Sequence, residues 1–271
     1  MDEVTFVGRG LHGGQRCELV LTRIQGPVAF ATTRGSATVA ELRVVRADRG
    51  VRVEAPGIGL DVELVEHLLA ALAGLHVRSG VRIEVIGGEV PLLDGGAREL
   101  ALGVRALSPT RAEPQLRITR EETLEIEDSA YRFAPSDRVE LEVIVDFPGV
   151  GRQSAEHDGD PVRFLERIAP ARTFGFASEA ETLRASGRAR FVDPHAVLVL
   201  DGDGRAHSAS GEPKPDELAR HKLLDLMGDL YLFGGPPVGR IVAERPGHAR
   251  SHEAMRKALD GGLIAPFRRR N

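Results

Sequence analysis

The stretch from Arg220 to Gly235, RHKLLDLMGDLYLFGG, constrains the fold more than any other part of the chain. At about 100° per residue, His221, Asp225 and Asp229 form a polar stripe about 80° wide on a helix. The opposite arc of this helix is apolar and consists of Leu223, Leu224, Leu226, Met227, Leu230 and Tyr231. A polar stripe on such a helix usually faces water. The helix alone therefore fits a solvated surface and a functional site about equally well.

Two details of this stripe favour a functional site. Gly228 lies within it, where glycine costs roughly 1 kcal/mol relative to alanine, so we expect another part of the chain to approach the helix backbone closely there. The stripe also carries a histidine and two short carboxylates instead of the long charged side chains common at the surface. A histidine and an aspartate four residues apart, such as His221 and Asp225, can reach one ion. A third ligand must then come from elsewhere.

Composition narrows the class of protein. The chain has 271 residues, of which 42% are apolar and 28% charged, so we expect a folded protein with two domains. A net charge of −4 gives no global basic field, so no nucleic-acid partner is expected.

The sequence also bears on the cellular location. Cys17 is the only cysteine, which excludes an intramolecular disulfide and suits a reducing compartment. The amino terminus does not resemble a signal peptide, and no apolar run approaches the roughly 20 residues of a membrane span. We therefore expect a cytoplasmic protein with no transmembrane segment.

The pattern along the chain predicts an α+β fold. Short alternating runs separated by glycine and proline predict hairpins between Val4 and Phe30, and residues 61–75 have helical spacing. The segment LSPTRAEPQ, residues 107–115, has two prolines and no apolar periodicity, so we place a domain boundary there and expect domains at residues 1–109 and 110–271. Alternating runs after this boundary predict a second antiparallel sheet, followed by further helices. A faint similarity between EHLLAALAGL and RHKLLDLMGDL suits two domains built alike, although chance explains it as easily.

His67 is the best candidate for the third ligand. It follows Glu66 at the start of an apolar helix, where a buried Glu-His pair is costly unless it has a use. Zinc sites with three protein ligands keep a fourth position for water, and a neighbouring carboxylate can take the proton of that water. Glu66 would be this base. The alternative is an ordinary helix start, with the glutamate near the positive end of the helix dipole.

Further residues complete a hypothesis of metal-assisted amide hydrolysis. His248, in ERPGHARSH, could protonate a departing amine if a carboxylate such as Asp229 oriented it. Thr173, in ARTFGF, could stabilise an oxyanion or simply cap a local turn. His12 lies in GRGLHGG, whose spacing matches neither a Walker nor a Rossmann motif, so no nucleotide cofactor is expected. We interpret the remaining histidines as surface or core residues: His76, His157, His195, His207 and His252.

Five segments in order, VEHLLAALAGL, EVPLLDGGA, IAPARTFGF, DELARHKLLDLMGDLYL and PGH, resemble the zinc-dependent UDP-3-O-acyl-N-acetylglucosamine deacetylases (LpxC) of lipid A synthesis. The resemblance extends over nearly the whole chain. It implies two similar α+β domains, each with a sheet layered on helices, and a zinc site at their interface. It also implies a zinc-dependent amidohydrolase that removes the N-acetyl group of an acylated UDP-N-acetylglucosamine.

The resemblance also implies a role for particular residues. It implies that the metal ligands are His67, His221 and Asp225. It implies a base, Glu66, and an acid, His248, which Asp229 orients. Thr173 corresponds to the oxyanion-stabilising threonine, and Lys222 to a lysine near the substrate. The residues expected to bind substrate are Phe174, Leu11, His12 and Lys222.

Some segments depart from the family pattern. The sequence GRARFVDPHAVLVL, residues 187–200, replaces a glycine- and serine-containing stretch that borders the substrate site in the family, and Leu64, Gly96 and Pro246 also differ from the usual residues. Two alternatives therefore stay open. One is a divergent zinc amidohydrolase that acts on another N-acylated sugar or amide. The other is a non-catalytic, metal-bearing protein that binds lipid A precursors. We expect a monomer with a small-molecule substrate and bound Zn²⁺, for which Fe²⁺ could substitute because nitrogen and oxygen ligands accept several divalent metals.

Overall fold

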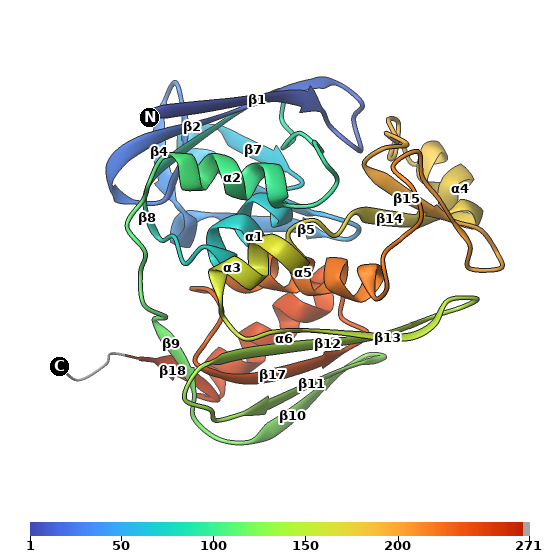
Figure 1. The fold of residues 1–271 in the computed structure, drawn as a ribbon. Coiled ribbons are helices and arrows are strands. Elements are labelled where there is room, and N and C mark those ends of the chain that lie inside the picture. Colours follow the sequence, from blue (N-terminus) through green and yellow to red (C-terminus); the bar gives the residue numbers. More distant parts are fainter. Residues whose placement is uncertain (268–271) are drawn as a thin grey trace.

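The computed structural model describes residues 1–267 and contains two large sheets with helices between them (Figure 1). The first sheet has the strand order β1-β2-β8-β3-β4. Its strands are β1 (Glu3–Arg9), β2 (Arg16–Pro27), β8 (Ser79–Ile86), β3 (Ala29–Thr32) and β4 (Gly35–Thr38). In β2 the alternating residues Cys17, Leu19 and Leu21 are buried, as a strand with one covered face requires.

The second large sheet has the order β10-β11-β17-β12-β13 and the same connectivity as the first. Its strands are β10 (Glu122–Ile126), β11 (Ser129–Ala134), β17 (Gly239–Glu244), β12 (Val139–Phe147) and β13 (Gly151–His157). In each sheet a later strand, β8 or β17, lies between two hairpins, antiparallel to one and parallel to the other. The predicted α+β class with two similar sheet-over-helix units is confirmed.

Apart from a short helix beside strand β15 (Val197–Leu200), the helices lie between the two large sheets (Figure 1). They are α1 (Glu66–Gly74), α2 (Arg98–Ala106), α3 (Pro161–Arg163), α5 (Glu217–Tyr231) and α6 (His248–Asp260), and α3 continues into a π-helical turn, Phe164–Ile168. One continuous apolar cluster runs from Leu19 of the first sheet through Leu68 and Leu224 to Val143 of the second. Within residues 1–267, no helix combines the length and the apolar character that a membrane span requires.

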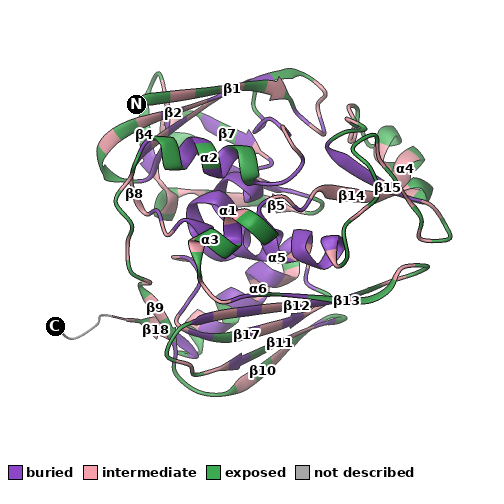
Figure 2. Cartoon of the chain, in the orientation of Figure 1, coloured by how far each residue is buried: buried purple, intermediate pink, exposed green. Residues whose placement is uncertain are grey.

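Helices α1 and α5 are at the centre of the molecule (Figure 2). Every residue of α1 is buried, and so is every residue of α5 except Lys222. The polar stripe of α5 therefore does not face water, because α1 packs against it. The predicted helical spacing over residues 61–75 was wrong at its start: Leu60–Glu63 forms strand β7, and the helix begins at Glu66. The reason is that β7 pairs with β6, a contact that local periodicity does not reveal.

Smaller sheets border the central helices. One contains β5 (Arg43–Ala47), β6 (Val51–Ala55) and β7, with the 3-10 turns Val39–Glu41 and Pro56–Ile58 beside it. Another contains β14 (Thr173–Phe176), β15 (Val197–Leu200) and β16 (Ala206–His207); the 3-10 turn Ala177–Glu179 and helix α4 (Ala180–Ala185) lie between its first two strands. A two-stranded sheet joins β9 (Leu116–Ile118) to β18 (Ile264–Pro266). The exact domain boundary between residues 109 and 110 stays a prediction.

Candidate metal centre

The close crossing of α1 and α5 sets the geometry of the site. A Cβ atom added to Gly228 would lie 2.1 Å from the carbonyl oxygen of Glu66 and 3.0 Å from its Cα atom. No side chain fits in that space, which confirms the expected close approach to the helix backbone at this glycine. The crossing places the first turn of α1, with Glu66 and His67, against the middle of α5.

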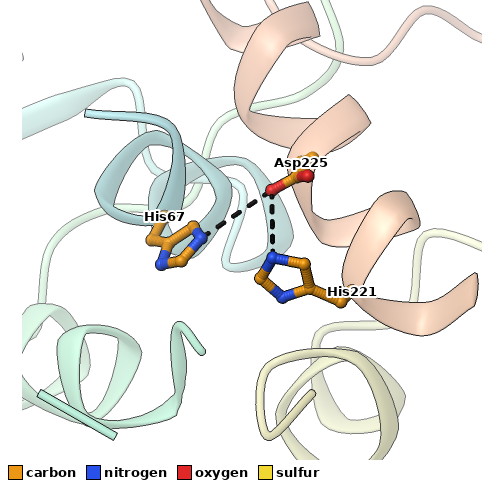
Figure 3. A group of neighbouring side chains, drawn as sticks. All are labelled: His67, His221 and Asp225. Carbon is orange, nitrogen blue, oxygen red and sulfur yellow. Dashed lines mark ion pairs between the residues drawn. The ribbon is translucent and has the colours of Figure 1, made fainter. Parts of the chain in front are cut away.

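His67, His221 and Asp225 converge from these two helices (Figure 3). The Oδ1 atom of Asp225 lies 3.7 Å from Nε2 of His67 and 3.6 Å from Nε2 of His221. All three side chains are buried, and one candidate ligand atom from each lies within 4.8 Å of the others. Tetrahedral ligands bound about 2.1 Å from zinc lie roughly 3.4 Å apart. These atoms are thus too far apart for hydrogen bonds to one another and close to the spacing that a shared cation requires.

The surroundings of His221 and Asp225 also suit a metal. Nδ1 of His221 lies 3.0 Å from the carbonyl oxygen of Ala171, which can only accept, so Nδ1 carries the hydrogen and the lone pair of Nε2 faces the cluster. Burial lowers the pKa of His221 to about 4, which keeps its imidazole neutral at pH 7. Although burial opposes it, Lys222 holds the pKa of Asp225 well below its usual range. Lys222 donates to Oδ2 of Asp225 at 2.7 Å, which leaves Oδ1 facing the two imidazoles.

Glu66 is a buried carboxylate at the edge of this cluster. Its Oε2 atom accepts the backbone N–H of Val51 at 2.9 Å, at the start of strand β6. Its Oε1 atom lies 4.0 Å from Nε2 of His248. The side chain is only 3% exposed. One oxygen is therefore anchored, while the other faces the imidazole that sequence reasoning assigned as an acid.

His248 is held by Asp229, as the sequence predicts. Its Nδ1 atom lies 2.9 and 3.0 Å from the two oxygens of Asp229, and its Nε2 atom lies 3.9 Å from Oδ2 of Asp225. Burial lowers the pKa of His248, but the negative charges of Asp229 and Asp225 outweigh it and raise this pKa to about 9. Conversely, despite burial, the imidazoles of His248 and His252 lower the pKa of Asp229 to about 2. His248 is therefore protonated at pH 7 and directs an N–H toward the cluster.

Sequence reasoning missed His252, which we interpreted as an ordinary surface or core histidine. Its Nε2 atom lies 2.9 Å from Oδ1 of Asp229, and the ring is buried. The signal was available, because His252 follows His248 by four residues on one helix, the spacing that joined His221 to Asp225. Of the other histidines, His157 is buried, whereas His195 and His207 are exposed.

Thr173 and Phe174 begin strand β14 beside α5. The hydroxyl of Thr173 donates to the carbonyl oxygen of Gly95 at 2.8 Å, so it must rotate before it can stabilise an oxyanion. The ring of Phe174 lies edge-on to His221, with 5.7 Å between ring centroids, and also contacts Phe147 at 5.2 Å. Phe147 and Phe174 are both partly exposed, so their rings provide an apolar wall next to His221, a candidate metal ligand.

His12 and Leu11 approach the site from the glycine-rich loop. Nε2 of His12 donates to the carbonyl oxygen of Arg49 at 2.9 Å, and its backbone N–H donates to Glu89 at 2.8 Å. A Cβ atom on Gly50 would lie 3.1 Å from Nε2 of His12 and 3.3 Å from Oε1 of Glu66, so these two side chains flank the same turn. Leu11 packs against a small apolar cluster that comprises Leu64, Leu92, Ala196 and Val197. The buried carboxylate of Glu89, which fixes this loop, was missed.

The site thus brings together three candidate metal ligands, a buried carboxylate and a protonated imidazole. Among residues 1–267, His67, His221 and Asp225 form the one group of three or more side chains with a spacing that could hold a metal ion. The neutral imidazole of His221, the ionised carboxylate of Asp225 and the hydrogen bonds that Ala171 and Lys222 make to them fit a divalent cation. Such an arrangement is suited to hydrolysis, because it can activate a water and protonate a leaving group at one place.

Comparison with known proteins points to one family. The family model described as LpxC, UDP-3-O-acyl N-acetylglycosamine deacetylase, matches residues 1–260. A UDP-3-O-acyl-N-acetylglucosamine deacetylase of Nitratidesulfovibrio vulgaris is 34% identical over 258 residues, which cover 92% of this chain and 83% of the relative. A protein of the same name from Myxococcus xanthus is 32% identical over 97% of this chain and 87% of the relative. Another, from Brucella ovis, is 36% identical over 73% of this chain and 71% of the relative.

Proposed function

The chain belongs to the UDP-3-O-acyl-N-acetylglucosamine deacetylase family, and from this premise we propose that it removes the N-acetyl group of a UDP-3-O-acyl-N-acetylglucosamine in lipid A synthesis. It is an enzyme of the amide hydrolase class. One observation carries the proposal: Glu66 and His248 lie 4.0 Å apart beside the three converging side chains of Figure 3. A protein that only binds a precursor has no need of a base and an acid at its metal ligands.

We propose zinc as the metal, with His67, His221 and Asp225 as the residues that would hold it. When bound, a divalent cation with an open coordination position polarises a carbonyl group and lowers the pKa of a bound water. Two imidazole nitrogens and one carboxylate oxygen are ligands that zinc accepts, and Fe²⁺ accepts them as well. The hydrogen bond from His221 to Ala171 supports this assignment, because it presents the Nε2 lone pair to the cluster.

Glu66 serves as the general base. The N–H of Val51 fixes one carboxylate oxygen, so the other is presented in a defined direction. From there it takes a proton from the water that attacks the acetyl carbonyl. A positioned base or acid typically contributes a rate factor of about 10²–10⁴.

His248 serves as the general acid. It holds a proton at Nε2, and Asp229 fixes the ring through Nδ1. As the C–N bond breaks, Nε2 donates this proton to the departing amine of the sugar. The raised pKa of about 9 ensures that the proton is present at neutral pH.

The remaining residues act on the substrate. We propose that Thr173 stabilises the oxyanion once its hydroxyl leaves Gly95, and that Phe174 offers an apolar face to the sugar. Lys222, which donates to Asp225, keeps a positive charge near the site for the anionic substrate. Leu11 and His12 border the same site from the glycine-rich loop. The expected cytoplasmic location and monomeric state remain predictions.

An assay of acetate release from labelled substrates tests the proposal. The zinc-loaded protein should release acetate from UDP-3-O-acyl-N-acetylglucosamine, and Glu66→Gln should keep the metal and lose turnover. Equal turnover of UDP-N-acetylglucosamine without the acyl chain would favour the divergent amidohydrolase. Absence of acetate release from every N-acetylated sugar tested, with the metal present, would favour the binding protein.

A further inference from the structure

Asp229 is a buried carboxylate shared by two imidazoles of α6. His248 contacts both of its oxygens, and His252 contacts Oδ1 alone at 2.9 Å. Asp229 is 1% exposed and His252 is 2% exposed. We propose that His252 is a positioning residue, which fixes the Asp229 carboxylate and through it the orientation of His248. This inference rests on the proposed function only in so far as His248 is the acid of that reaction.

The hydrogen of His252 can be assigned from its partners. An ionised carboxylate only accepts hydrogen bonds, so Nε2 of His252 is the donor toward Asp229. The other ring nitrogen, Nδ1, is buried and has no partner among residues 1–267. A hydrogen on Nδ1 would be a buried donor without an acceptor, which is costly. His252 therefore carries its hydrogen on Nε2 and gives a permanent N–H to Asp229.

The Nε2–H of His252 restricts the rotation of the Asp229 carboxylate. His248 and His252 are four residues apart on α6, so both rings lie on the face of the helix that meets Asp229 of α5. A carboxylate held only by His248 could turn about its side-chain torsions together with that ring. The second N–H, from a ring that packs edge-on to Phe233 at 5.4 Å between centroids, removes this freedom. As a result Nε2 of His248 remains aimed at the site that Glu66 and Asp225 border.

A purely packing role fits these contacts less well. An apolar ring of similar size would fill the same space beside Phe233 without the cost of burying the unpaired Nδ1 nitrogen. The only hydrogen bond that the imidazole of His252 makes within the described residues is the one to Asp229. The imidazole therefore contributes its N–H, and that N–H has one acceptor.

Two substitutions at His252 separate these roles. His252→Phe keeps the ring and removes the donor, whereas His252→Gln keeps an N–H at a similar reach. We expect His252→Phe to lower kcat about 10- to 100-fold, as outer hydrogen-bond partners do, with KM and metal content unchanged and with kcat largely restored in His252→Gln. The matched control is His157→Phe, which removes another buried imidazole whose Nδ1 has no partner in the described structure and which we do not assign to the site.

A double substitution tests whether His252 acts through Asp229. In an Asp229→Ala background, His252→Phe should cause no further loss of kcat, because the carboxylate that it positions is gone. If the double variant loses kcat by the product of the two single losses, the proposal is overturned. A loss of kcat in His157→Phe as large as that in His252→Phe would also overturn it.

A spectroscopic measurement tests the same inference without turnover. In ¹⁵N-histidine NMR spectra of the zinc-loaded protein, His252 should carry its hydrogen on Nε2, and the Nδ1–H signal of His248 should shift and broaden in His252→Phe. A hydrogen on Nδ1 of His252, or an unchanged His248 signal in His252→Phe, would refute the proposal. Because the spectra need no substrate, failure of the deacetylation assay and failure of this inference can be told apart.

Discussion

Substitution of Gly228 by alanine tests the crossing of α1 and α5 most severely. The added Cβ atom would meet three backbone atoms of Glu66, at 2.1, 2.9 and 3.0 Å, and backbone cannot swing aside as a side chain can. A carbon–oxygen contact needs about 3.3 Å, so the two helices must separate by roughly 1 Å. This movement would carry His67 away from His221 and Asp225, because the first belongs to α1 and the others to α5.

The expected size of the effect follows from two opposing terms. Overpacking a core costs about 1–3 kcal/mol, and alanine regains roughly 1 kcal/mol of helix propensity. The clash involves backbone, so the upper part of the range applies, and we expect Gly228→Ala to lower the free energy of unfolding by about 1–2 kcal/mol. That corresponds to a fall in Tm of roughly 2–4 °C for a chain of 271 residues. Because a displacement near 1 Å at a reacting centre costs about 100-fold in rate, we expect Gly228→Ala to lower turnover by about this factor.

Thermal unfolding, metal affinity and acetate release should be measured together for Gly228→Ala. The matched control is Gly103→Ala in α2, where the added Cβ atom would meet the ring of Phe6, 2.3 Å away, and no residue of the site. We expect the control to lose stability and keep its turnover and metal affinity. Wild-type Tm and turnover in Gly228→Ala would refute the argument, since the helices would then tolerate a separation that the geometry forbids.

Three further changes have defined outcomes. Glu66→Gln should bind metal normally and lose turnover by about 10²–10⁴-fold. Metal analysis and an acetate-release assay of this variant check the prediction, and loss of the metal would show that Glu66 is a ligand instead. His221→Ala should lose metal and activity together, whereas Asp229→Ala should keep the metal and lose on the order of 10- to 100-fold in rate; equal metal loss in both would overturn the assignment of Asp229. Burial lowers the pKa of His157 to about 4 from its ordinary 6.5, so the unfolded chain binds a proton there that the folded chain rejects. His157 therefore destabilises the fold progressively as pH falls from about 6.5 to 4, by about 3 kcal/mol in total; urea unfolding of His157→Phe should lose this dependence, and an unchanged pH profile would contradict it.

The helix that carries the ligands could be predicted from its sequence because its pattern is local. The stripe of His221, Asp225 and Asp229 and the glycine within it are properties of a single helical turn or two, and Gly228 signalled a neighbouring backbone before any partner was known. The structure identifies that neighbour as Glu66. The pairing of His248 with Asp229 could also be predicted from the sequence, since an imidazole that acts as an acid needs a carboxylate to orient it.

Other parts of the site depend on contacts that no local pattern contains. The residues of strand β7 have the apolar spacing of a helix, and their pairing with β6 makes them a strand. Glu89 holds the backbone of His12 from 77 residues away. The sequence places His252 four residues after His248, but the partner of its imidazole, Asp229, lies on another helix, so only the packed structure pairs them. The hydroxyl of Thr173 is bonded to Gly95, 78 residues distant in the chain, which only the packed structure shows.

Metal titration of the purified protein tests the central claim most directly. After removal of any bound metal, isothermal titration with Zn²⁺ should give one tight site per chain, and the site should be lost in His67→Ala, His221→Ala and Asp225→Ala but kept in Glu66→Gln. A wild-type protein that takes up no metal, or that binds it equally well when Asp225 is replaced, would contradict the account.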